Sequence, residues 1–388
     1  MLFTVPNLQP EELEVLEKID SMRQSLRYSI SARRRWVGVL RRATFARNIR
    51  HSNSIEGIDV SRDDALAAVG DDEPLTAEKA AWQATLGYRN AMTYVLQLAD
   101  DPHFTHSEGL LRGLHFMMMQ QDFDKKPGRY RSGVIYVRDE RMQANVYQGP
   151  EPEAVPGLMA ELMRSLNGPS NMPGMVRAAM GHLNLVMIHP FADGNGRMAR
   201  CLQTLILGRE QIIGPPFCSI EEYLGRYTQE YYDVLGEVGR GTWRPGNDCR
   251  PWIRFNLVAH YRQAAWLLQR SKIMQRVWGE IEELVRKKGI NERALPTLAD
   301  AAFGYRIRRT QYVSSAEVSE QVASRDLRIL VDEGLLLAEG ETKGRIYSAA
   351  PALAEIHARH YETRTHADPF ADTAMGQRTV VLSSGTAE

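Results

Sequence analysis

Residues 189–200 read HPFADGNGRMAR and bring side chains of complementary chemistry into one short stretch. His189 can accept a proton near neutral pH, and the Asp193 carboxylate offers the hard oxygen ligands with which Mg²⁺ binds alongside phosphate. Arg197 and Arg200 are three residues apart, so on a helix they share a face and can grip several phosphate oxygens together. These residues predict phosphoryl or nucleotidyl transfer, with a hydroxyl group as the acceptor.

The backbone of this stretch is expected to form a nest for an anion. A helical pattern over 175–188 must end at His189, because the proline that follows disfavours helical geometry there. Two turn dipeptides, DG and NG, come next, and a helical period restarts near 197. The new helix begins with free N–H groups and the positive end of its dipole, and glycines let a phosphate approach closely. The predicted anion-binding residues are Gly194, Asn195, Gly196, Arg197 and Arg200.

Two other nucleotide-binding patterns do not account for the stretch. GNGRMA at 194–199 fits the loose G-x-G-x-x-A dinucleotide fingerprint, but that fingerprint needs a preceding strand and a βαβ unit, and the surrounding pattern is helical. The P-loop pattern G-x-x-x-x-G-K-S/T does not occur in the chain. A helix, a glycine-rich loop and a second helix are therefore predicted.

The stretch resembles the motif of the Fic family, H-P-F-x-D/E-G-N-G-R-x-x-R, at every fixed position. The resemblance implies an enzyme that transfers AMP from ATP to a Ser, Thr or Tyr hydroxyl of a target protein, with Mg²⁺ as cofactor. It implies that His189 is the general base and that Asp193 holds the Mg²⁺. It also implies an anion hole in which Asn195 reaches the α-phosphate, while Arg197 and Arg200 hold the β- and γ-phosphates.

GRYRSGVIYV at 128–137 resembles the hairpin flap of the same family. Such a flap docks a segment of the target protein by strand addition. The resemblance places Val134, Ile135 and Tyr136 in the docking strand. It also implies that Phe191 is buried and anchors the motif loop.

YLGRYTQEYYDVL at 223–235 resembles the family segment that lines the adenine and ribose pocket. Tyr231 and Tyr232 match its tyrosine pair and are implied nucleotide-binding residues. Core packing of an amphipathic helix explains the two tyrosines equally well. Tyr227 stands where the family often has Asn, which separates this chain from the family pattern at that position.

SNSIEG at 52–57 resembles the inhibitory motif S/T-x-x-x-E-G/N of the family, with Ser52, Glu56 and Gly57 at its fixed positions. A glutamate brought against Arg200 would make a charge-assisted pair and take the place of the ATP γ-phosphate. The resemblance implies self-inhibition, and it allows an alternative activity in which the same glutamate positions a water that removes AMP from a modified protein. Taken alone, the motif is also explained by a helix end with an ordinary surface glutamate.

A mostly helical scaffold is expected to position these residues. Apolar residues recur at spacings of three and four, and in the first two-thirds of the chain only 127–148 has the β-forming residues of a hairpin. The expected helices cover 10–30, 33–50, 78–98, 107–120, 154–166, 175–188, 197–210, 219–235 and 251–270. The basic stretch 33–50 is interpreted as the solvated face of an amphipathic helix. We predict a mainly α fold: a helical Fic-type core with a small β-hairpin flap, followed by a winged helix-turn-helix domain.

Four regions are predicted along the chain. They are an N-terminal helical region with the inhibitory helix (1–105), the Fic catalytic core (106–270), the winged helix-turn-helix domain (271–350) and a disordered tail (362–388). In the third region, helices at 273–289, 308–316 and 319–334 precede two strands within 335–349. That order is typical of a winged helix.

A nucleotide-sensing, DNA-binding regulator is the rival interpretation. Residues 319–336 have a recognition-helix pattern. The side chains expected at a groove or at phosphates are Ser324, Arg325, Arg328, Arg308, Arg309, Lys343 and Arg345. Glu320 and Asp326 weaken this interpretation, and a winged helix also serves protein contacts. A homodimer is a further partner that the family resemblance leaves open.

The bulk composition narrows the class of protein. The 388 residues include 48 Lys plus Arg and 48 Asp plus Glu, so the formal net charge is +0 and no overall field attracts nucleic acid or anionic lipid. The N-terminus lacks the basic region of a secretory signal, and no apolar run has the length of a membrane span. The three cysteines have no paired spacing. We therefore expect a cytoplasmic protein that does not contact membranes.

Overall fold

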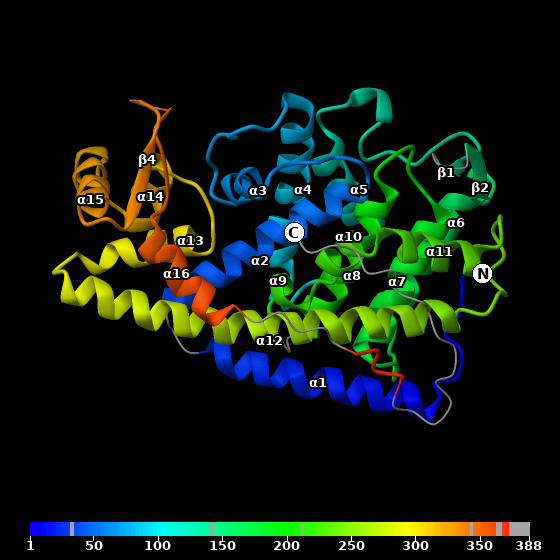
Figure 1. Cartoon of the computed structure of the whole chain (residues 1–388). Coiled ribbons are helices and arrows are strands. Elements are labelled where there is room, and N and C mark those ends of the chain that lie inside the picture. The colour runs from blue at the N-terminus through cyan, green and yellow to red at the C-terminus, as the bar shows by residue number, and fades with distance from the viewer. Residues whose placement is uncertain (32–34, 140–142, 211–212, 342–343, 362–366, 372–388) are drawn as a thin grey trace.

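The structure, a computed structural model, is mainly helical and describes residues 1–31, 35–139, 143–210, 213–341, 344–361 and 367–371 (Figure 1). The N-terminal helices are α1 (Pro10–Ser31), α2 (Arg35–Ser54), α3 (Arg62–Val69), α4 (Lys79–Leu98) and α5 (Glu108–Met119). A flap of strands β1 (Tyr136–Asp139) and β2 (Ala144–Gln148) follows the short helix η1 (Phe123–Lys125). The next elements are η2 (Pro152–Ala154), α6 (Val155–Asn167), α7 (Gly174–Ile188), α8 (Asn195–Arg209) and α9 (Pro215–Cys218). The mainly α fold is confirmed.

Helices α7 and α8 form the buried centre of the molecule and carry the motif loop between them. They approach closely at Gly181, where an added Cβ would lie 2.7 Å from Ile206 Cδ1. A larger residue there would push the two helices apart, because core packing leaves no free volume. The helix, loop and helix expected around residues 189–196 are confirmed.

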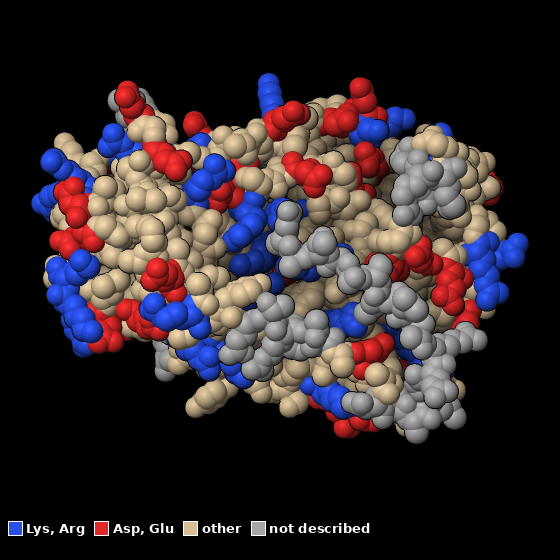
Figure 2. All heavy atoms as spheres, viewed as in Figure 1, with Lys and Arg blue, Asp and Glu red and all other residues tan. Residues whose placement is uncertain are grey.

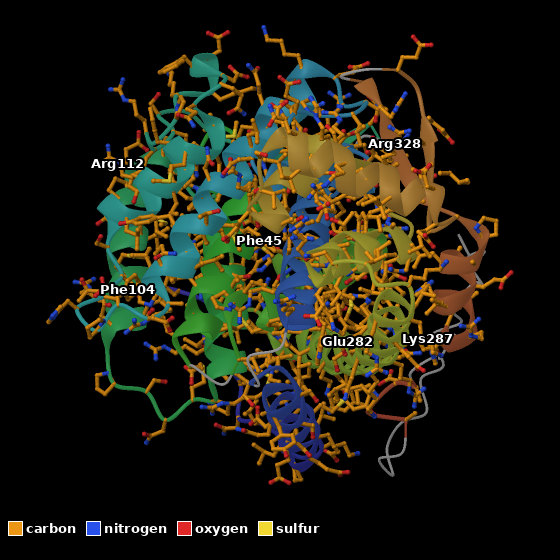
Figure 3. All side chains as sticks on the ribbon, turned by 90° about the vertical axis from the view of Figure 1, so that its left-hand side faces the viewer. Phe45, Phe104, Arg112, Glu282, Lys287 and Arg328 are labelled. Carbon is orange, nitrogen blue, oxygen red and sulfur yellow. The ribbon has the colours of Figure 1, made fainter. Side chains whose placement is uncertain are left out.

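Helix α2 runs diagonally through the middle of the molecule rather than along its surface (Figure 1). Phe45 lies near the centre of the view in Figure 3 and is buried. Among the arginines of this helix, Arg42 pairs with Asp300, and Arg50 donates to the carbonyl of Val60 at 3.1 Å. The described part of the basic stretch, 35–50, is thus less solvated than expected, because Arg42 and Arg50 bind groups of other segments, while residues 33 and 34 lie outside the described residues.

The predicted hairpin is confirmed as an antiparallel pair with Tyr136 opposite Gln148 and Val137 opposite Tyr147. Its turn residues 140–142 lie outside the described residues. The Tyr147 hydroxyl donates to the carbonyl of Met187 at 2.8 Å, so β2 is attached to the end of α7. The flap therefore stands directly beside the motif loop.

The single helix expected over 219–235 is two helices, α10 (Glu221–Arg226) and α11 (Thr228–Gly239). Tyr227 separates them with φ −121° and ψ 46°, outside helical geometry. The Thr228 hydroxyl donates to the carbonyl of Gly225 at 3.1 Å, and such side-chain bonds compete with the backbone pattern of a continuous helix. The Tyr227 ring stacks on Tyr223 with centroids 4.5 Å apart.

The helices expected at 251–270 and 273–289 are one helix, α12 (Arg250–Lys287). It runs without interruption across the predicted domain boundary at 270 and 271, because neither glycine nor proline occurs there to end it. Helix α1 lies along α12 (Figure 1), and the buried carboxylate of Glu12 pairs with Arg250 and Arg254. The C-terminal region therefore begins on a rigid extension of the core.

The C-terminal region follows η3 (Glu292–Ala294). Its elements are α13 (Leu295–Ala302), β3 (Ile307–Arg308), α14 (Arg309–Ala316), α15 (Glu320–Asp332), β4 (Leu336–Glu339), β5 (Ile346–Ala349) and α16 (Pro351–His360). The strands form an antiparallel sheet in the order β3-β5-β4. This order of elements is consistent with a winged helix-turn-helix. Its first helix is α13 rather than the predicted 273–289, which belongs to α12.

Three further sequence expectations concern the chain as a whole. Within the described residues, no helix is long and apolar enough to cross a membrane. Cys201, Cys218 and Cys249 are buried and unpaired in this part of the chain. The predicted disordered tail lies outside the described residues except for 367–371, where Arg254 lies 5.3 Å from the Phe370 ring centroid.

Candidate active site

His189 stands at the end of α7 in the left-handed conformation, with φ 51° and ψ 59°. Its Nδ1 lies 3.1 Å from the carbonyl oxygen of Val186. Because a carbonyl can only accept, Nδ1 carries the ring hydrogen and Nε2 keeps its lone pair. Burial lowers the pKa of His189, which favours the neutral form at physiological pH. The side chain is thus prepared to accept a proton at Nε2.

The motif loop is closed by the side chain of Asn195. Its Oδ1 accepts from the Phe191 N–H at 2.9 Å, and its Nδ2 donates to the Phe191 carbonyl at 2.9 Å. Phe191 is fully buried, as expected for an anchor. Both ends of the Asn195 side-chain amide therefore bind the loop itself, and the prediction that Asn195 reaches an α-phosphate stays with its backbone. Its backbone N–H still belongs to the first turn of α8, where helix N–H groups have no partner within the helix.

Asp193 offers a partly exposed carboxylate beside that first turn. Its Oδ1 accepts from the Gly194 N–H at 2.6 Å, and its Oδ2 lies 3.8 Å from Lys125 Nζ. No group of three or more His, Cys, Asp or Glu side chains in the described ranges could hold a metal alone. A single carboxylate fits Mg²⁺ that arrives with phosphate oxygens, since Mg²⁺ commonly takes one or two carboxylates plus phosphate and water.

Arg197 and Arg200 place cationic groups under the same loop, and both side chains are almost completely buried. Arg197 Nε and Nη1 and Arg200 Nη1 have no hydrogen-bond partner among the described residues. Burial lowers the pKa of Arg197, and the charges of Glu56 and Asp193 offset this only in part. Buried charge without a partner is costly, so these nitrogens indicate a site for an anion with several oxygens.

Arg200 forms an ion pair with Glu56, which lies just after the end of α2. Arg200 Nη2 lies 2.7 Å from Glu56 Oε1, and it also donates to the Ser52 carbonyl at 2.8 Å. Arg200 Nε donates to the Ser52 hydroxyl at 2.8 Å. Burial is the largest effect and opposes the charge of Arg200, but Glu56 together with the hydroxyls of Tyr231 and Tyr88 outweighs it and raises the pKa. A Cβ placed on Gly196 would collide with Glu56 Oε1, so the glutamate carboxylate lies over the first turn of α8.

A tight turn after α2 brings Glu56 to this position. Gly57 adopts φ +72°, a conformation that glycine reaches without strain. The Tyr232 hydroxyl donates to the carbonyl of Ile55 at 3.1 Å and attaches α11 to the turn. Ser52 and Glu56 of the predicted inhibitory motif therefore contact Arg200, and Gly57 forms the turn beside them.

The two predicted nucleotide-binding tyrosines differ in position. Tyr231 is only 1% exposed. Gln203 Oε1 lies 2.6 Å from His182 Nδ1, so this nitrogen is the donor and His182 Nε2 accepts from the Tyr231 hydroxyl at 2.9 Å. Tyr231 thus packs in the core behind Arg200, and its assignment as a nucleotide contact stays a prediction. Tyr232 is 42% exposed and remains available at the site.

Arg131 is a residue of this site that the sequence did not indicate. Its buried guanidinium donates to the carbonyls of His189 at 2.8 Å, Gly133 at 2.8 Å and Pro150 at 2.6 Å. Its backbone N–H donates to the carbonyl of Pro190 at 2.9 Å. One side chain therefore joins the base of the flap to the histidine turn. An arginine just before a hairpin carries no local signal of this role, because all but one of the carbonyls it binds are distant in sequence.

The flap residues lie where a target segment could reach them. Val134 is 47% exposed and Tyr136 is 51% exposed, while Ile135 is partly buried against Gly149. Among the described residues, β1 has no partner strand on its outer edge, whereas Gln148 of β2 also bridges Thr242. Such an edge can pair with an extended peptide.

The residues predicted for DNA contact lie in different surroundings in the structure. Arg328 lies on α15 near the edge of the molecule and pairs with Asp332 at 3.8 Å (Figure 3). Arg309 pairs with Glu320 at 3.1 Å. Arg308 donates to the carbonyls of Glu73 and Pro74, so its guanidinium faces the α3–α4 connection rather than an open groove. Basic and acidic residues alternate on the face in Figure 2, and Lys343 lies outside the described residues.

The C-terminal region is also attached to α2, whose end carries the inhibitory motif, and to α3, which follows that motif. Arg306 Nε lies 2.6 Å from Asp63 Oδ2 on α3, and Asp300 on α13 pairs with Arg42 on α2. These contacts place α2 and α3 between the motif loop and the C-terminal region.

Comparison with known proteins finds a family and relatives that this chain resembles. Residues 105–207 match the Fic/DOC family. The chain is 29% identical over 254 residues to Protein adenylyltransferase Fic of Nematostella vectensis, which covers 65% of this chain and 55% of that relative. It is 34% identical over 140 residues to Protein adenylyltransferase fic-1 of Caenorhabditis briggsae, covering 36% of this chain and 24% of the relative. The chain thus spans about half the length, or less, of these curated relatives.

Solved structures share the fold. A Fic family protein from Desulfovibrio desulfuricans G20 has a TM-score of 0.58 and 21% identity, covering 90% of this chain and 99% of that protein. Residues 134–508 of Fic-1 from C. elegans have a TM-score of 0.53 and 22% identity, covering 67% of this chain and 73% of that one. Together with the complete motif from His189 to Arg200, these matches show that the chain carries a Fic domain of the Fic/DOC family.

Proposed function

We propose that this protein transfers AMP from ATP to a Ser, Thr or Tyr hydroxyl of a target protein. The observation that carries the proposal is the set of buried guanidinium nitrogens of Arg197 and Arg200 that lack partners in the described structure, beside the start of α8. A polyphosphate has the charge and the number of oxygens to satisfy them. The names of the curated relatives support the same activity.

In this proposal the target hydroxyl attacks the α-phosphorus of ATP, and the bond to the β-phosphate breaks so that pyrophosphate leaves. His189 takes the hydroxyl proton at Nε2, the ring nitrogen that its hydrogen bond to Val186 leaves without a hydrogen. The N–H groups at the start of α8 and the two arginines stabilise the phosphate charge. Asp193 would hold Mg²⁺, which neutralises charge on the phosphates when it is bound.

Glu56 inhibits the transfer in this proposal, and its pair with Arg200 is called the brake below. Its carboxylate occupies the start of α8 and pairs with Arg200, so an ATP γ-phosphate and the glutamate compete for the same guanidinium. ATP bound without that arginine would not present its α-phosphate correctly to His189. The wild-type protein should therefore be weakly active, and loss of Glu56 should activate it.

The test is incubation of wild type, Glu56→Gly and Glu56→Gly with His189→Ala in lysate with ATP labelled either at the α- or at the γ-phosphorus. We expect protein labelling from α-labelled ATP only, strongest with Glu56→Gly and lost with His189→Ala. Labelling from γ-labelled ATP would indicate phosphoryl transfer and contradict the proposal. Equal labelling by wild type and Glu56→Gly would contradict the brake but leave the transfer reaction in place.

Removal of AMP is a second candidate activity, favoured by the position of Glu56. Its side chain is 26% exposed and its carboxylate stands at the start of α8, so a water beside it could reach an α-phosphate bound there. The test is incubation of an AMP-modified target protein with wild type and with Glu56→Gly. Release of AMP by wild type alone would support this activity, and equal release by both proteins would exclude a role of Glu56 in it.

A further inference from the structure

His115 lies directly under the motif loop, although it is distant from that loop in sequence. It is fully buried on α5, and its ring stacks on Phe191 with centroids 3.8 Å apart and an interplanar angle of 4°. Its Nε2 lies 3.0 Å from the Asp193 carbonyl oxygen, and its Nδ1 lies 2.8 Å from the Gly128 nitrogen. One imidazole thus contacts the anchor of the loop, the peptide that precedes Gly194, and the residue that leads into the flap.

These contacts determine which ring nitrogen carries the hydrogen. The Gly128 backbone N–H can only donate, so Nδ1 is the acceptor and Nε2–H donates to the Asp193 carbonyl. Burial lowers the pKa of His115 to about 4, which agrees with a neutral ring held in one tautomer. His115 is therefore a fixed hydrogen-bond donor to the loop rather than a group that exchanges protons.

The hydrogen bond to Asp193 fixes the orientation of one peptide plane. In a trans peptide the carbonyl and the N–H point in opposite directions. Because the Asp193 carbonyl faces the buried imidazole, the Gly194 N–H faces the opposite side, where it meets the partly exposed Asp193 carboxylate. Gly194 has φ +75°, and a glycine offers little steric resistance to rotation of this peptide. A donor beneath the loop is what keeps the N–H on the side where the anion would bind.

We propose that His115 is a positioning residue of this site. Its Nε2–H locks the Asp193–Gly194 peptide so that the Gly194 N–H and the Asp193 carboxylate stay on the phosphate side of the loop. This inference rests on the proposed AMP transfer for its kinetic readout, but its effect on nucleotide binding does not depend on any transfer reaction. His115 touches neither the reacting atoms nor the nucleotide; it acts through the loop.

The test compares three substitutions in the activated Glu56→Gly background. His115→Phe keeps the ring that stacks on Phe191 and loses both hydrogen bonds. His115→Gln places an amide N–H near the position of Nε2–H, whereas His115→Asn is too short to donate to Asp193. His106→Gln is the matched control, because His106 lies just before α5 and its backbone binds Asn167 instead of the motif loop.

Two quantities are measured for each variant: kcat and KM for ATP in AMP transfer, and the Kd for ATP by calorimetry without transfer to a target. We expect kcat/KM to fall about tenfold or more in His115→Phe and His115→Asn, in keeping with the loss of an aligned phosphate donor. The Kd should rise in parallel. His115→Gln should recover most of both losses, and His106→Gln should match the parent.

Unchanged kcat/KM and Kd in His115→Phe would overturn the inference. Equal losses in His115→Gln and His115→Asn would show that the ring volume matters and not the donor, which also overturns it. If His115→Phe does not fold, as judged by thermal unfolding, the comparison of Gln with Asn still decides. If the Glu56→Gly parent transfers no AMP, the proposed function fails, while the Kd values still test His115.

Discussion

The ion pair between Glu56 and Arg200 allows a quantitative prediction about the brake. Arg200 Nη2 and Glu56 Oε1 are 2.7 Å apart, with Arg200 1% and Glu56 26% exposed. A hydrogen bond between charged groups that are this well buried contributes about 1.5–3 kcal/mol. If this free energy is what ATP must displace, removing it should raise transfer about ten- to hundredfold, since each 1.4 kcal/mol is a factor of ten.

Two substitutions separate the charge of the glutamate from its volume. Glu56→Gln keeps the size of the side chain and a neutral hydrogen-bond acceptor, so it should release only part of the inhibition. Glu56→Gly removes both and should release all of it. Glu355→Gln, at an exposed glutamate on α16, is the matched control and should transfer AMP at the wild-type rate.

The assay is initial-rate incorporation of AMP from α-labelled ATP, paired with thermal unfolding with and without ATP. Loss of Glu56 leaves the buried Arg200 without its carboxylate partner, although its Ser52 contacts stay, so the unfolding temperature should fall without nucleotide. ATP should then stabilise Glu56→Gly more than wild type, because binding to the folded state alone adds stability. If ATP stabilises both proteins equally and their rates agree, the glutamate does not compete with the nucleotide and the reasoning is refuted.

Three further predictions concern other groups. Burial lowers the pKa of His189, so the base is neutral at physiological pH. The transfer rate of Glu56→Gly should therefore be level through pH 7–8 and decline only below about 6.5. A decline that begins above pH 7 would contradict the assignment of His189 as the base. Burial raises the pKa of Glu221 from 4.5 to about 7, so the folded protein binds the extra proton in that window and stability decreases as the pH rises through it. Glu221→Gln should therefore be more stable than wild type at pH 8, by up to about 3 kcal/mol, with no gain at pH 4.5, as measured by urea unfolding; a pH-independent difference would count against it. Asp300→Asn leaves Arg42 of α2 without its carboxylate partner and should lower the free energy of unfolding by about 1–3 kcal/mol. It should also raise AMP transfer, because α13 then holds the inhibitory helix α2 less firmly. Transfer at the wild-type level despite a lower unfolding temperature would show that α13 does not hold that helix.

Local signals in the sequence were sufficient for the motif loop and for most helices. Pro190 ends the preceding helix, and paired turn dipeptides set the loop, because these effects act within a few residues. The residue types from His189 to Arg200 likewise predicted a phosphate site, because each carries its chemistry in its own side chain.

Contacts between distant segments were decided only by the tertiary structure. Tyr231 could be assigned to the nucleotide or to the core from its spacing, and only the packing around His182 placed it in the core. Arg131 and His115 gave no local signal, because the backbone groups they bind on the motif loop are recognised only once α5, the flap and α7 have come together. The single helix α12 replaced two expected helices, since hydrophobic periodicity does not register where one helix ends unless a breaker is present.

The Glu56–Arg200 pair shows most clearly which features follow from the residue types and which depend on packing. The residue types alone give Glu56 and Arg200 opposite charges, and the family resemblance implied that they meet. Only the tertiary structure brought them together, across a separation of 144 residues, by running α2 through the core and turning the chain at Gly57. The physical reason is that an ion pair depends on distance and burial, and both are properties of packed helices rather than of neighbouring residues.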